Sequence, residues 1–313
     1  MSGTHVYDMI VVGGGPGGYT AALYAARAGL DTLVLEKLSA GGQMALTDVI
    51  DNYPGYEDGI DGFTLGDQMQ QQAEKFGAES ELTSVTSVEL TGDIKVVHTS
   101  DAGDYKTRCV VIATGANARQ LGLPNEAALA DKGIHYCAAC DGMRFKGKTV
   151  ALVGGGNTAL EDALLLSRLC EKVYLVHRRD QYRAEKFYAD AVAEATNIEP
   201  VLNSVVESVD VEGGFKGVTV KNVKTDETRF LESEALFVSV GRVPNTEFLQ
   251  GAVSVDGSGY IEADETTRTS VPGVFAVGDI RTKPMRQVVT AAADGAVSSM
   301  FAQQYIEELK AKA

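Results

Sequence analysis

Short apolar runs alternate along the chain with Ala- and Leu-rich segments whose apolar positions recur at the helical period. Runs at residues 7–12 and 149–153 each lead into a glycine-rich turn, and helical patterns at residues 19–28 and 160–169 follow these turns. This order predicts strand–turn–helix units. The alternation of strands and helices along the chain predicts an α/β fold with a mostly parallel sheet.

The remaining pattern continues the alternation, with a strand-rich stretch at residues 199–230 for which we expect hairpins. Polar, aperiodic segments at residues 116–124 and 241–245 are the expected domain crossings. We further expect strands at 31–35, two within 81–99, and strands at 109–113, 173–176, 235–240 and 274–277, with helices at 65–76 and from Met285 or Gln287 onward.

The first glycine turn, residues 13–18, has the composition of a dinucleotide-binding turn. Gly13 permits a tight turn, Gly15 lets the backbone approach a pyrophosphate, and Gly18 lets helix and strand pack closely. Glu36 ends the next predicted strand, where a carboxylate binds ribose hydroxyls and repels a 2'-phosphate. The turn therefore predicts FAD or NAD, and a turn with a purely structural role is the alternative.

The second glycine turn, residues 154–159, repeats this unit with Ala159 in the last place, but the following strand ends in His177-Arg178-Arg179. Arg183 adds a further positive charge. Guanidinium groups at this strand end bind a 2'-phosphate by charge-assisted hydrogen bonds, so the site is predicted to prefer NADP over NAD. The alternative is a solvated, charged start of a helix.

Cys137 and Cys140 are the two cysteines of a Cys-x-x-Cys pair, which can open to a dithiol and pass electrons to another disulfide. Cys109 and Cys170 stand in apolar surroundings and are expected to be buried and inert. A zinc site would need about four ligands. Because the pair has only His135 nearby, we expect no metal and assign His135 a packing or capping role.

The composition is that of a globular protein, with 44% hydrophobic and 23% charged residues. A formal net charge of −15 disfavours nucleic acid and anionic membranes as partners. Residues 9–12 form too short an apolar run for a membrane span or a leader, so we expect a cytoplasmic protein with no membrane association.

Taken together, these motifs and Ala276-Val277-Gly278-Asp279 resemble the low-molecular-weight thioredoxin reductases, nearly from end to end and in the same order. The resemblance implies two Rossmann-like three-layer nucleotide-binding domains, the second inserted into the first. An FAD domain would comprise residues 1–116 and 246–313, and an NADPH domain carrying the cysteine pair would comprise residues 117–245. It also implies a homodimer, with thioredoxin or a thioredoxin-like protein as partner.

Site residues follow from the same resemblance, position by position. Cys140 would face the flavin, Cys137 would attack the partner disulfide, and Asp141 would protonate the departing thiolate; a turn cap is the alternative role for Asp141. The implied motion is a swing of the NADPH domain about the two crossings. The expected cofactor-binding residues are Gly13, Gly15, Pro16, Gly18, Glu36, Gly42, Gln43, Asn52 and Gly115 in the first part of the chain, Gly156, Asn157, Thr158, His177, Arg178, Arg179 and Arg183 in the second, and Gly278, Asp279, Arg286, Gln287 and Val288 in the last.

Other functions remain open at the level of sequence. The same flavoprotein could be reduced by ferredoxin or could pass electrons to oxygen, although the cluster His177-Arg178-Arg179 argues against both. A nucleotide-binding regulator with incidental cysteines is a further alternative. Alkyl hydroperoxide reductase flavoproteins share the motifs but carry an extra N-terminal redox module, which we do not expect here because Gly13 lies close to the first residue.

Overall fold

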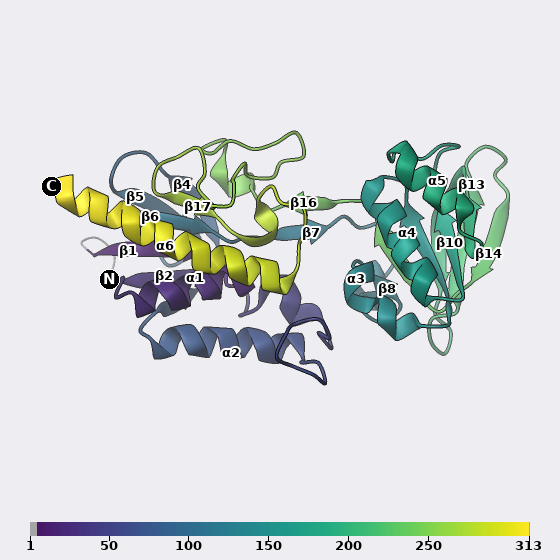
Figure 1. The fold of residues 1–313 in the computed structure, drawn as a ribbon, viewed down its shortest axis with the longest axis horizontal. Helices are drawn as coiled ribbons and strands as arrows, with labels where there is room; N and C mark the ends of the chain where they lie inside the picture. Colours follow the sequence, from purple (N-terminus) through teal and green to yellow (C-terminus); the bar gives the residue numbers. More distant parts are fainter. Residues whose placement is uncertain (1–4, 313) are drawn as a thin grey trace. The chain divides into compact units, whose positions relative to one another are not determined.

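The computed structural model describes residues 5–312. The chain forms two compact units, one comprising Met1–Asn117 and Val243–Ala313 and the other Ala118–Arg242. The chain passes from one unit to the other at β7 (Ala116–Ala118) and β16 (Arg242–Pro244), which pair as a two-stranded sheet (Figure 1). The middle of the sequence is therefore an insertion into the first unit.

The first unit is built on a seven-stranded sheet in which β1, β2, β3, β6 and β17 run parallel. One side of β6 pairs with β1; the other side pairs with β5 along its first half and with β17 along its second half. The strands are β1 (Val6–Val12), β2 (Thr32–Glu36), β3 (Glu79–Leu82), β4 (Val85–Glu89), β5 (Lys95–Thr99), β6 (Asp104–Ile112) and β17 (Val274–Ala276).

Successive residues of β1 face opposite sides of this sheet, as the two-residue period of a strand requires. Met9 and Val11 pack with α1 (Pro16–Arg27) and α6 (Val288–Lys312), whereas Ile10 and Val12 pack with residues 248–261. The unit also contains α2 (Gly62–Lys75) and the short 3-10 helices η1 (Gly42–Leu46), η4 (Glu247–Leu249) and η5 (Gly278–Ile280).

The second unit has a five-stranded, wholly parallel sheet in the order β11-β10-β9-β15-β8. Helices α4 (Asn157–Leu169) and α5 (Lys186–Glu194) pack on one face, and an antiparallel three-stranded sheet packs on the other (Figure 1). The unit's strands are β8 (Ile134–His135), β9 (Thr149–Gly154), β10 (Lys172–Val176), β11 (Ile198–Val201), β12 (Ser204–Asp210), β13 (Gly217–Asn222), β14 (Thr228–Glu232) and β15 (Leu236–Ser239), and its short helices are η2 (Glu126–Leu129), α3 (Ala138–Asp141) and η3 (Gly142–Phe145).

These sheets confirm the predicted α/β class, and the elements differ from expectation mainly at their ends. The first helix begins at Pro16 rather than at residue 19, because proline is tolerated at the first helical position. The strand expected at residues 109–113 begins at Asp104, because polar residues in its first half pair with β5. Across residues 5–312, every helix is too short or too polar to serve as a membrane span.

Candidate redox and nucleotide sites

The two cysteines of the Cys-x-x-Cys pair form a disulfide at the start of α3. Cys137 is the N-cap residue: its Sγ and its carbonyl oxygen each lie 3.2 Å from the Cys140 backbone nitrogen. Both side chains are partly exposed. A disulfide held by one helical turn and open to solvent is suited to thiol exchange, which requires access to a sulfur atom.

Asp141 follows this disulfide directly, and its buried carboxyl group lies against His135. The Asp141 Oδ2 and His135 Nδ1 atoms are 3.1 Å apart, within hydrogen-bond distance. The other oxygen, Oδ1, is buried without a hydrogen-bond partner among the described residues, and the nearest guanidinium atom, Arg144 Nη1, lies 3.8 Å away. The residue after Cys140 therefore has one buried carboxyl oxygen that accepts no hydrogen bond from the described residues and is paired only with Arg144.

Three possible metal-ligand atoms, from Asp131, His135 and Asp141, lie within 4.8 Å of one another. The contact between His135 and Asp141 is nevertheless explained as a direct hydrogen bond. The cysteines are joined to each other, so in this state they offer no thiolate ligands. Structural zinc sites use four ligands, and this group does not supply them.

The thiols outside the pair are buried, as the sequence predicts. Cys109 lies in β6 and Cys170 follows α4. Burial raises the pKa of the Cys170 thiol to about 11 and raises the pKa of Cys109 further still. Because the thiolate is the reactive form, both cysteines are poor nucleophiles.

The first glycine turn joins β1 to α1 and has one crowded and one open position. A Cβ on Gly18 would lie 1.9 Å from the carbonyl oxygen of Gly13, which itself has a φ of +106°. By contrast, a Cβ on Gly15, the N-cap of α1, would meet nothing nearer than 4.0 Å. The turn is therefore tightly packed at Gly18 and open at Gly15. Pro16 is the first residue of α1, and the N–H groups at a helix N-terminus favour a phosphate.

Glu36, at the end of β2, is tied to this turn. Its Oε2 accepts a hydrogen bond of 2.5 Å from the Gly14 N–H, and its Oε1 accepts one from the backbone of Lys37 at 2.8 Å. The carboxylate is therefore fixed at the carboxyl edge of the sheet next to the glycine turn. This is where a ribose hydroxyl is bound in the dinucleotide fold.

Several loop residues expected near a flavin come together around the same turn. Gly42 lies against Gly15, since a Cβ on Gly42 would be 3.5 Å from the Cα atom of Gly15. Gln43 donates a hydrogen bond to the Asn117 side chain at 3.1 Å. Gly115, with a φ of +66°, accepts a backbone hydrogen bond from Asn245.

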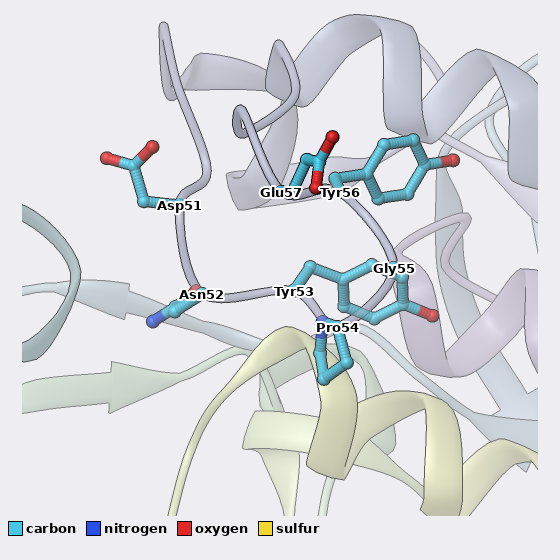
Figure 2. A pocket seen from close by; sticks show the side chains of 7 residues that line it. All are labelled: Asp51, Asn52, Tyr53, Pro54, Gly55, Tyr56 and Glu57. Carbon is cyan, nitrogen blue, oxygen red and sulfur yellow. The ribbon is translucent and has the colours of Figure 1, made fainter.

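The loop at residues 51–57 lines a hollow of about 640 Å³ (Figure 2). From this loop, the Asn52 side-chain amide donates a hydrogen bond of 3.1 Å to the Gln287 side chain. Gln287 directly precedes α6, whose first residue is Val288. Two positions separated by more than 200 residues in the sequence therefore meet at one helix N-terminus.

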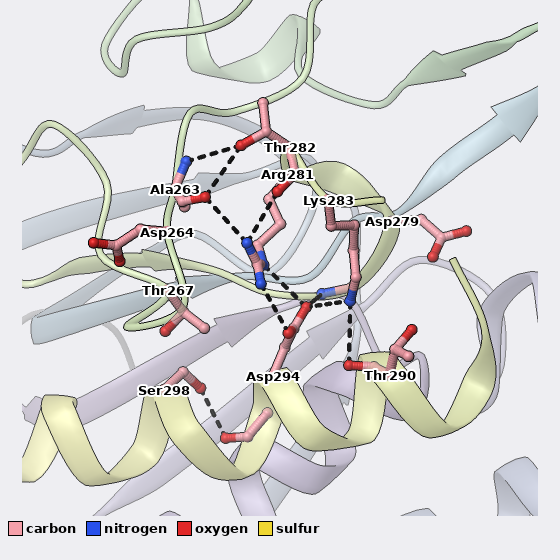
Figure 3. A network of polar contacts seen from close by, with 12 residues as sticks. Ala263, Asp264, Thr267, Asp279, Arg281, Thr282, Lys283, Thr290, Asp294 and Ser298 are labelled. Carbon is pink, nitrogen blue, oxygen red and sulfur yellow. Dashed lines mark hydrogen bonds and ion pairs between the residues drawn. The ribbon is translucent and has the colours of Figure 1, made fainter. Parts of the chain in front are cut away.

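Asp294, which sequence reasoning did not identify, organises the turn that carries Gly278 and Asp279. Its carboxylate accepts hydrogen bonds from the Gly278 N–H at 2.9 Å, from Arg281 at 3.1 Å and from Lys283 at 2.7 Å (Figure 3). Burial alone would raise the pKa of Asp294, but these donors outweigh it, so the pKa lies below its ordinary value. The Asp279 carboxylate points away from this network.

Arg286 completes the C-terminal motif. Its guanidinium lies 4.0 Å from the centre of the Tyr260 ring and donates to the carbonyl oxygens of Asp279 and Arg281. The turn after β17 is thus held from both sides, by α6 through Asp294 and by the segment before α6 through Arg286.

The second glycine turn, between β9 and α4, repeats the division into crowded and open positions. A Cβ on Gly154 would lie 2.4 Å from the Ala159 Cβ, whereas a Cβ on Gly156 would meet nothing within 4 Å. Thr158 is exposed beside it, and the Asn157 side chain exchanges two hydrogen bonds with Glu185, at 2.8 and 3.0 Å. The open face therefore lies at the N-terminus of α4.

His177 supports this turn from below instead of facing solvent. A Cβ on Gly155 would lie 2.1 Å from the His177 ring, and the His177 Nε2 atom is 3.1 Å from the carbonyl oxygen of Gln181. Burial is the main reason that the pKa of His177 is lowered, and Arg178 and Arg179 add to the effect. The ring therefore packs under the turn, where burial disfavours its charged form.

The Arg178, Arg179 and Arg183 side chains are exposed beside the second turn. In the part of the chain that the structure describes, no ion pair engages these three guanidinium groups. The Arg183 backbone N–H bonds to the carbonyl oxygen of Gly155 at 2.7 Å, which fixes the loop to the glycine turn. Three cations near an open helix N-terminus form a site for a multiply charged anion.

Sequence reasoning missed one contact and one residue of these sites. The packing role predicted for His135 is confirmed by its burial against the Phe145 and Phe237 rings, but its contact with Asp141, six residues later, was not expected. Asp294 had a sequence signal: it is an acidic residue on the buried face of an Ala-rich helix. A buried carboxylate of that kind requires a partner.

Comparisons with known proteins find a matching family, similar sequences and similar solved structures. A family model described as pyridine nucleotide-disulphide oxidoreductase matches residues 7–295. A thioredoxin reductase of Streptomyces clavuligerus is 44% identical, covering 97% of this chain and 95% of that protein. One from Treponema pallidum is 42% identical, with 97% and 98% covered. The crystal structure of thioredoxin reductase from Streptococcus pyogenes matches with a TM-score of 0.91 and 40% identity over 98% of this chain and 100% of that one.

Proposed function

This chain belongs to the pyridine nucleotide-disulphide oxidoreductase family, and on that premise we propose that it is a thioredoxin-disulfide reductase. The observation that carries the proposal is the partly exposed Cys137–Cys140 disulfide, placed in the same unit as the second glycine turn. Its relatives are named for reducing a protein disulfide, and this pair is the group that can do so here.

FAD is the cofactor proposed for the first unit, and the residues present fit it. Gly15 and Gly42 leave backbone exposed at the N-terminus of α1, where unpaired N–H groups favour a pyrophosphate. Glu36 is fixed where a ribose hydroxyl would be bound. Asn52, Gln287 and the Gly278 turn would line the remainder of the site.

NADPH is the cofactor proposed for the second unit. The open surface at Gly156 would take the pyrophosphate, and Arg178, Arg179 and Arg183 would hold the 2'-phosphate. When bound, the two cofactors supply the two-electron transfer that opens the disulfide. The three arginines favour a nicotinamide donor over the two alternative functions, in which ferredoxin would reduce the flavin or oxygen would oxidise it.

The chain's own residues then handle sulfur and protons. Cys137 is proposed to attack the disulfide of thioredoxin or a thioredoxin-like protein, with Cys140 resolving the mixed disulfide by re-forming the Cys137–Cys140 bond. Asp141 is proposed as the acid that protonates the departing thiolate, since its Oδ1 atom is buried and accepts no hydrogen bond from the described residues. We also propose a cytoplasmic location, because such a pair works catalytically in a reducing compartment. The homodimer is proposed from the resemblance to the low-molecular-weight thioredoxin reductases.

Anaerobic titration of the purified yellow protein tests this function. NADPH is expected to bleach the flavin band near 450 nm, and oxidised thioredoxin is expected to restore it. Cys140→Ser should keep the bleaching and lose the recovery. If NADPH leaves the band unchanged while dithionite bleaches it, the second unit is not the electron entry site and the proposal fails.

A further inference from the structure

Glu126, at the start of η2, is a buried carboxylate of the second unit. It is 3% exposed and accepts four hydrogen bonds. Three come from the consecutive backbone N–H groups of residues 121, 122 and 123, at 2.9, 2.8 and 3.1 Å. The fourth comes from the Tyr136 hydroxyl at 2.8 Å. Both carboxylate oxygens therefore have donors, which compensate for the burial of the charge.

The ionisation of both side chains follows from this arrangement. Burial alone would raise the pKa of Glu126, but the backbone donors and the Tyr136 hydroxyl outweigh it, so the pKa lies below its ordinary value. Burial and the bond to Glu126 both raise the pKa of Tyr136, so its hydroxyl remains a donor. At neutral pH the contact is therefore a charge-assisted hydrogen bond. We call this contact the tyrosine anchor.

The tyrosine anchor lies next to the redox pair, because Tyr136 is the residue before Cys137. β8 ends at His135 and α3 begins at Ala138, so Tyr136 and Cys137 connect these two elements. The Tyr136 ring packs against the core between the parallel sheet and the three-stranded sheet. The protein thus holds the Tyr136 ring through this core and its hydroxyl through Glu126.

The two cysteines of the pair are held in different ways. Cys140 lies inside α3, and Ala138 of this helix is buried with Phe145 in the core beside α4. Cys137 is the N-cap residue, with extended backbone angles (φ −144°, ψ 100°), and its carbonyl oxygen accepts the first bonds of the helix. On its other side it is joined to Tyr136. When the S–S bond opens, the position of Tyr136 therefore limits how far the Cys137 sulfur can move.

We propose that Glu126 and Tyr136 are positioning residues that hold Cys137 close to Cys140 in the dithiol form, which makes the dithiol a stronger reductant. The inference rests on the proposed disulfide exchange at this pair and deepens it. In the oxidised form the S–S bond itself orders residues 137–140, whereas in the dithiol form only the surrounding protein does. The tyrosine anchor reduces the conformational entropy that is gained when the S–S bond opens, and this favours the closed form.

Closure of the pair is the step that releases a reduced partner. The Cys137 thiolate first attacks one sulfur of the partner disulfide, and the other partner sulfur leaves as a thiolate. The Cys140 thiolate then attacks the Cys137 sulfur of the mixed disulfide, so the Cys137–Cys140 bond forms and the bond to the partner breaks. Each departing partner thiolate keeps its electron pair and takes a proton from solvent. Over both exchanges the pair loses two electrons and the partner gains them.

The test measures the redox equilibrium of the pair directly. The holoenzyme is equilibrated anaerobically at neutral pH with glutathione at different ratios of thiol to disulfide, and free thiols are trapped with N-ethylmaleimide. Mass spectrometry of the peptide that contains both cysteines gives the reduced fraction. Two glutathione thiols reduce the pair and become one glutathione disulfide, so these fractions give the equilibrium constant for reduction. Tyr136→Phe removes the hydroxyl and keeps the ring, so this constant should rise about two- to fivefold.

The redox constant distinguishes positioning from simple stabilisation. A bond that stabilised the disulfide and dithiol forms equally would lower the urea midpoint when removed but leave the redox constant unchanged. The matched control is Tyr7→Phe, which removes a tyrosine–carboxylate bond of 3.1 Å to Glu79 in the other unit and should leave the constant unchanged.

Glu126→Gln gives a second measurement of the same anchor. It removes the charge that holds the Tyr136 hydroxyl, so it should also raise the constant. In the double variant with Tyr136→Phe, the rise should be smaller than the product of the two single effects, as expected for residues that act through one bond.

The outcomes separate this inference from the proposed function. Equal constants for the native protein and Tyr136→Phe would overturn the positioning role, even where NADPH bleaches the flavin normally. An equal rise in Tyr7→Phe would also overturn it, because the effect would then not depend on the tyrosine anchor. A rise confined to the anchor variants, together with a flavin that NADPH leaves unbleached, would support the role and reject the nicotinamide donor. If Glu126→Gln fails to fold, Tyr136→Phe alone decides the question.

Discussion

The Asp294 carboxylate in α6 accepts the backbone N–H of Gly278 at 2.9 Å, so a helix near the C-terminus holds the turn after β17. The same carboxylate neutralises Arg281, which is 4% exposed, and Lys283. The Asp294 side chain therefore neutralises two buried cations and also holds the turn that is proposed to contact the flavin.

Removing this carboxylate should destabilise the first unit and release flavin. Asp294→Ala leaves two buried cations unpaired, which costs about 3–5 kcal/mol. We expect a lower urea midpoint and a lower ratio of flavin to protein absorbance after gel filtration. Asp67→Asn, which changes an exposed carboxylate on α2 bonded to Gln71, is the control and should alter neither measurement. Full flavin content in Asp294→Ala would show that the turn keeps its shape without the network.

The lowered pKa of Asp294 gives this contribution a defined pH dependence. A carboxylate whose pKa is lower in the folded than in the unfolded state stabilises the fold fully above its unfolded value, about 4, and loses that contribution as the pH falls through its folded value. The difference in unfolding free energy between native protein and Asp294→Asn should therefore be largest near pH 7 and shrink below pH 4. Urea titrations at several pH values measure it, and a constant difference would contradict the role.

Most of the fold was predictable because its pattern is local. The glycine turns, their flanking strands and their helices are contiguous, so period and spacing identify them. The turn at Gly278 was expected from the apolar strand that ends there, with an Asx-capped turn as the alternative. The role of the loop at Asn52 could be named only through a family resemblance, because the contact from Asn52 to Gln287 joins distant segments. The local pattern does not indicate which loops meet at the N-terminus of α6.

The site was less predictable where tertiary packing decides a side chain's direction. His177 follows its strand in the position expected for a cofactor-facing residue, yet its ring turns under Gly155 and only the neighbouring arginines face solvent. His135 is the converse, since an apparently ordinary packing residue meets a buried carboxyl group. In both cases the sequence position was informative and the orientation depended on neighbours in the fold.

Cofactor preference should depend on the exposed arginines. Replacing Arg178 and Arg179 with Ala removes charge-assisted hydrogen bonds worth about 1.5–3 kcal/mol to a 2'-phosphate, so NADPH binding should weaken about ten- to a hundredfold. NADH lacks this phosphate and should bind nearly unchanged. The control is Arg229→Ala in the same unit, whose guanidinium pairs with Glu199. Anaerobic flavin reduction measured against the concentration of each nucleotide gives the ratio, and an unchanged ratio would reject the assignment.

The glycine turns permit a sharper separation of folding from binding. Gly154→Ala would place a Cβ 2.4 Å from the Ala159 Cβ and 2.5 Å from the carbonyl oxygen of Ser239, so the second unit should be destabilised. Gly156→Ala meets nothing within 4 Å, so this variant should fold normally. Its added methyl group would stand where the pyrophosphate is proposed to approach the backbone, and NADPH affinity should fall while the urea midpoint stays unchanged.

The pair of variants is informative because the two substitutions are chemically identical and lie two residues apart. Thermal unfolding and NADPH titration of both proteins give four measurements. Stability loss confined to Gly154→Ala and affinity loss in a stable Gly156→Ala would locate the phosphate at the N-terminus of α4, where exposed N–H groups favour an anion. Native affinity in Gly156→Ala would instead move the nucleotide away from this turn, leaving the arginines beside it without their proposed ligand.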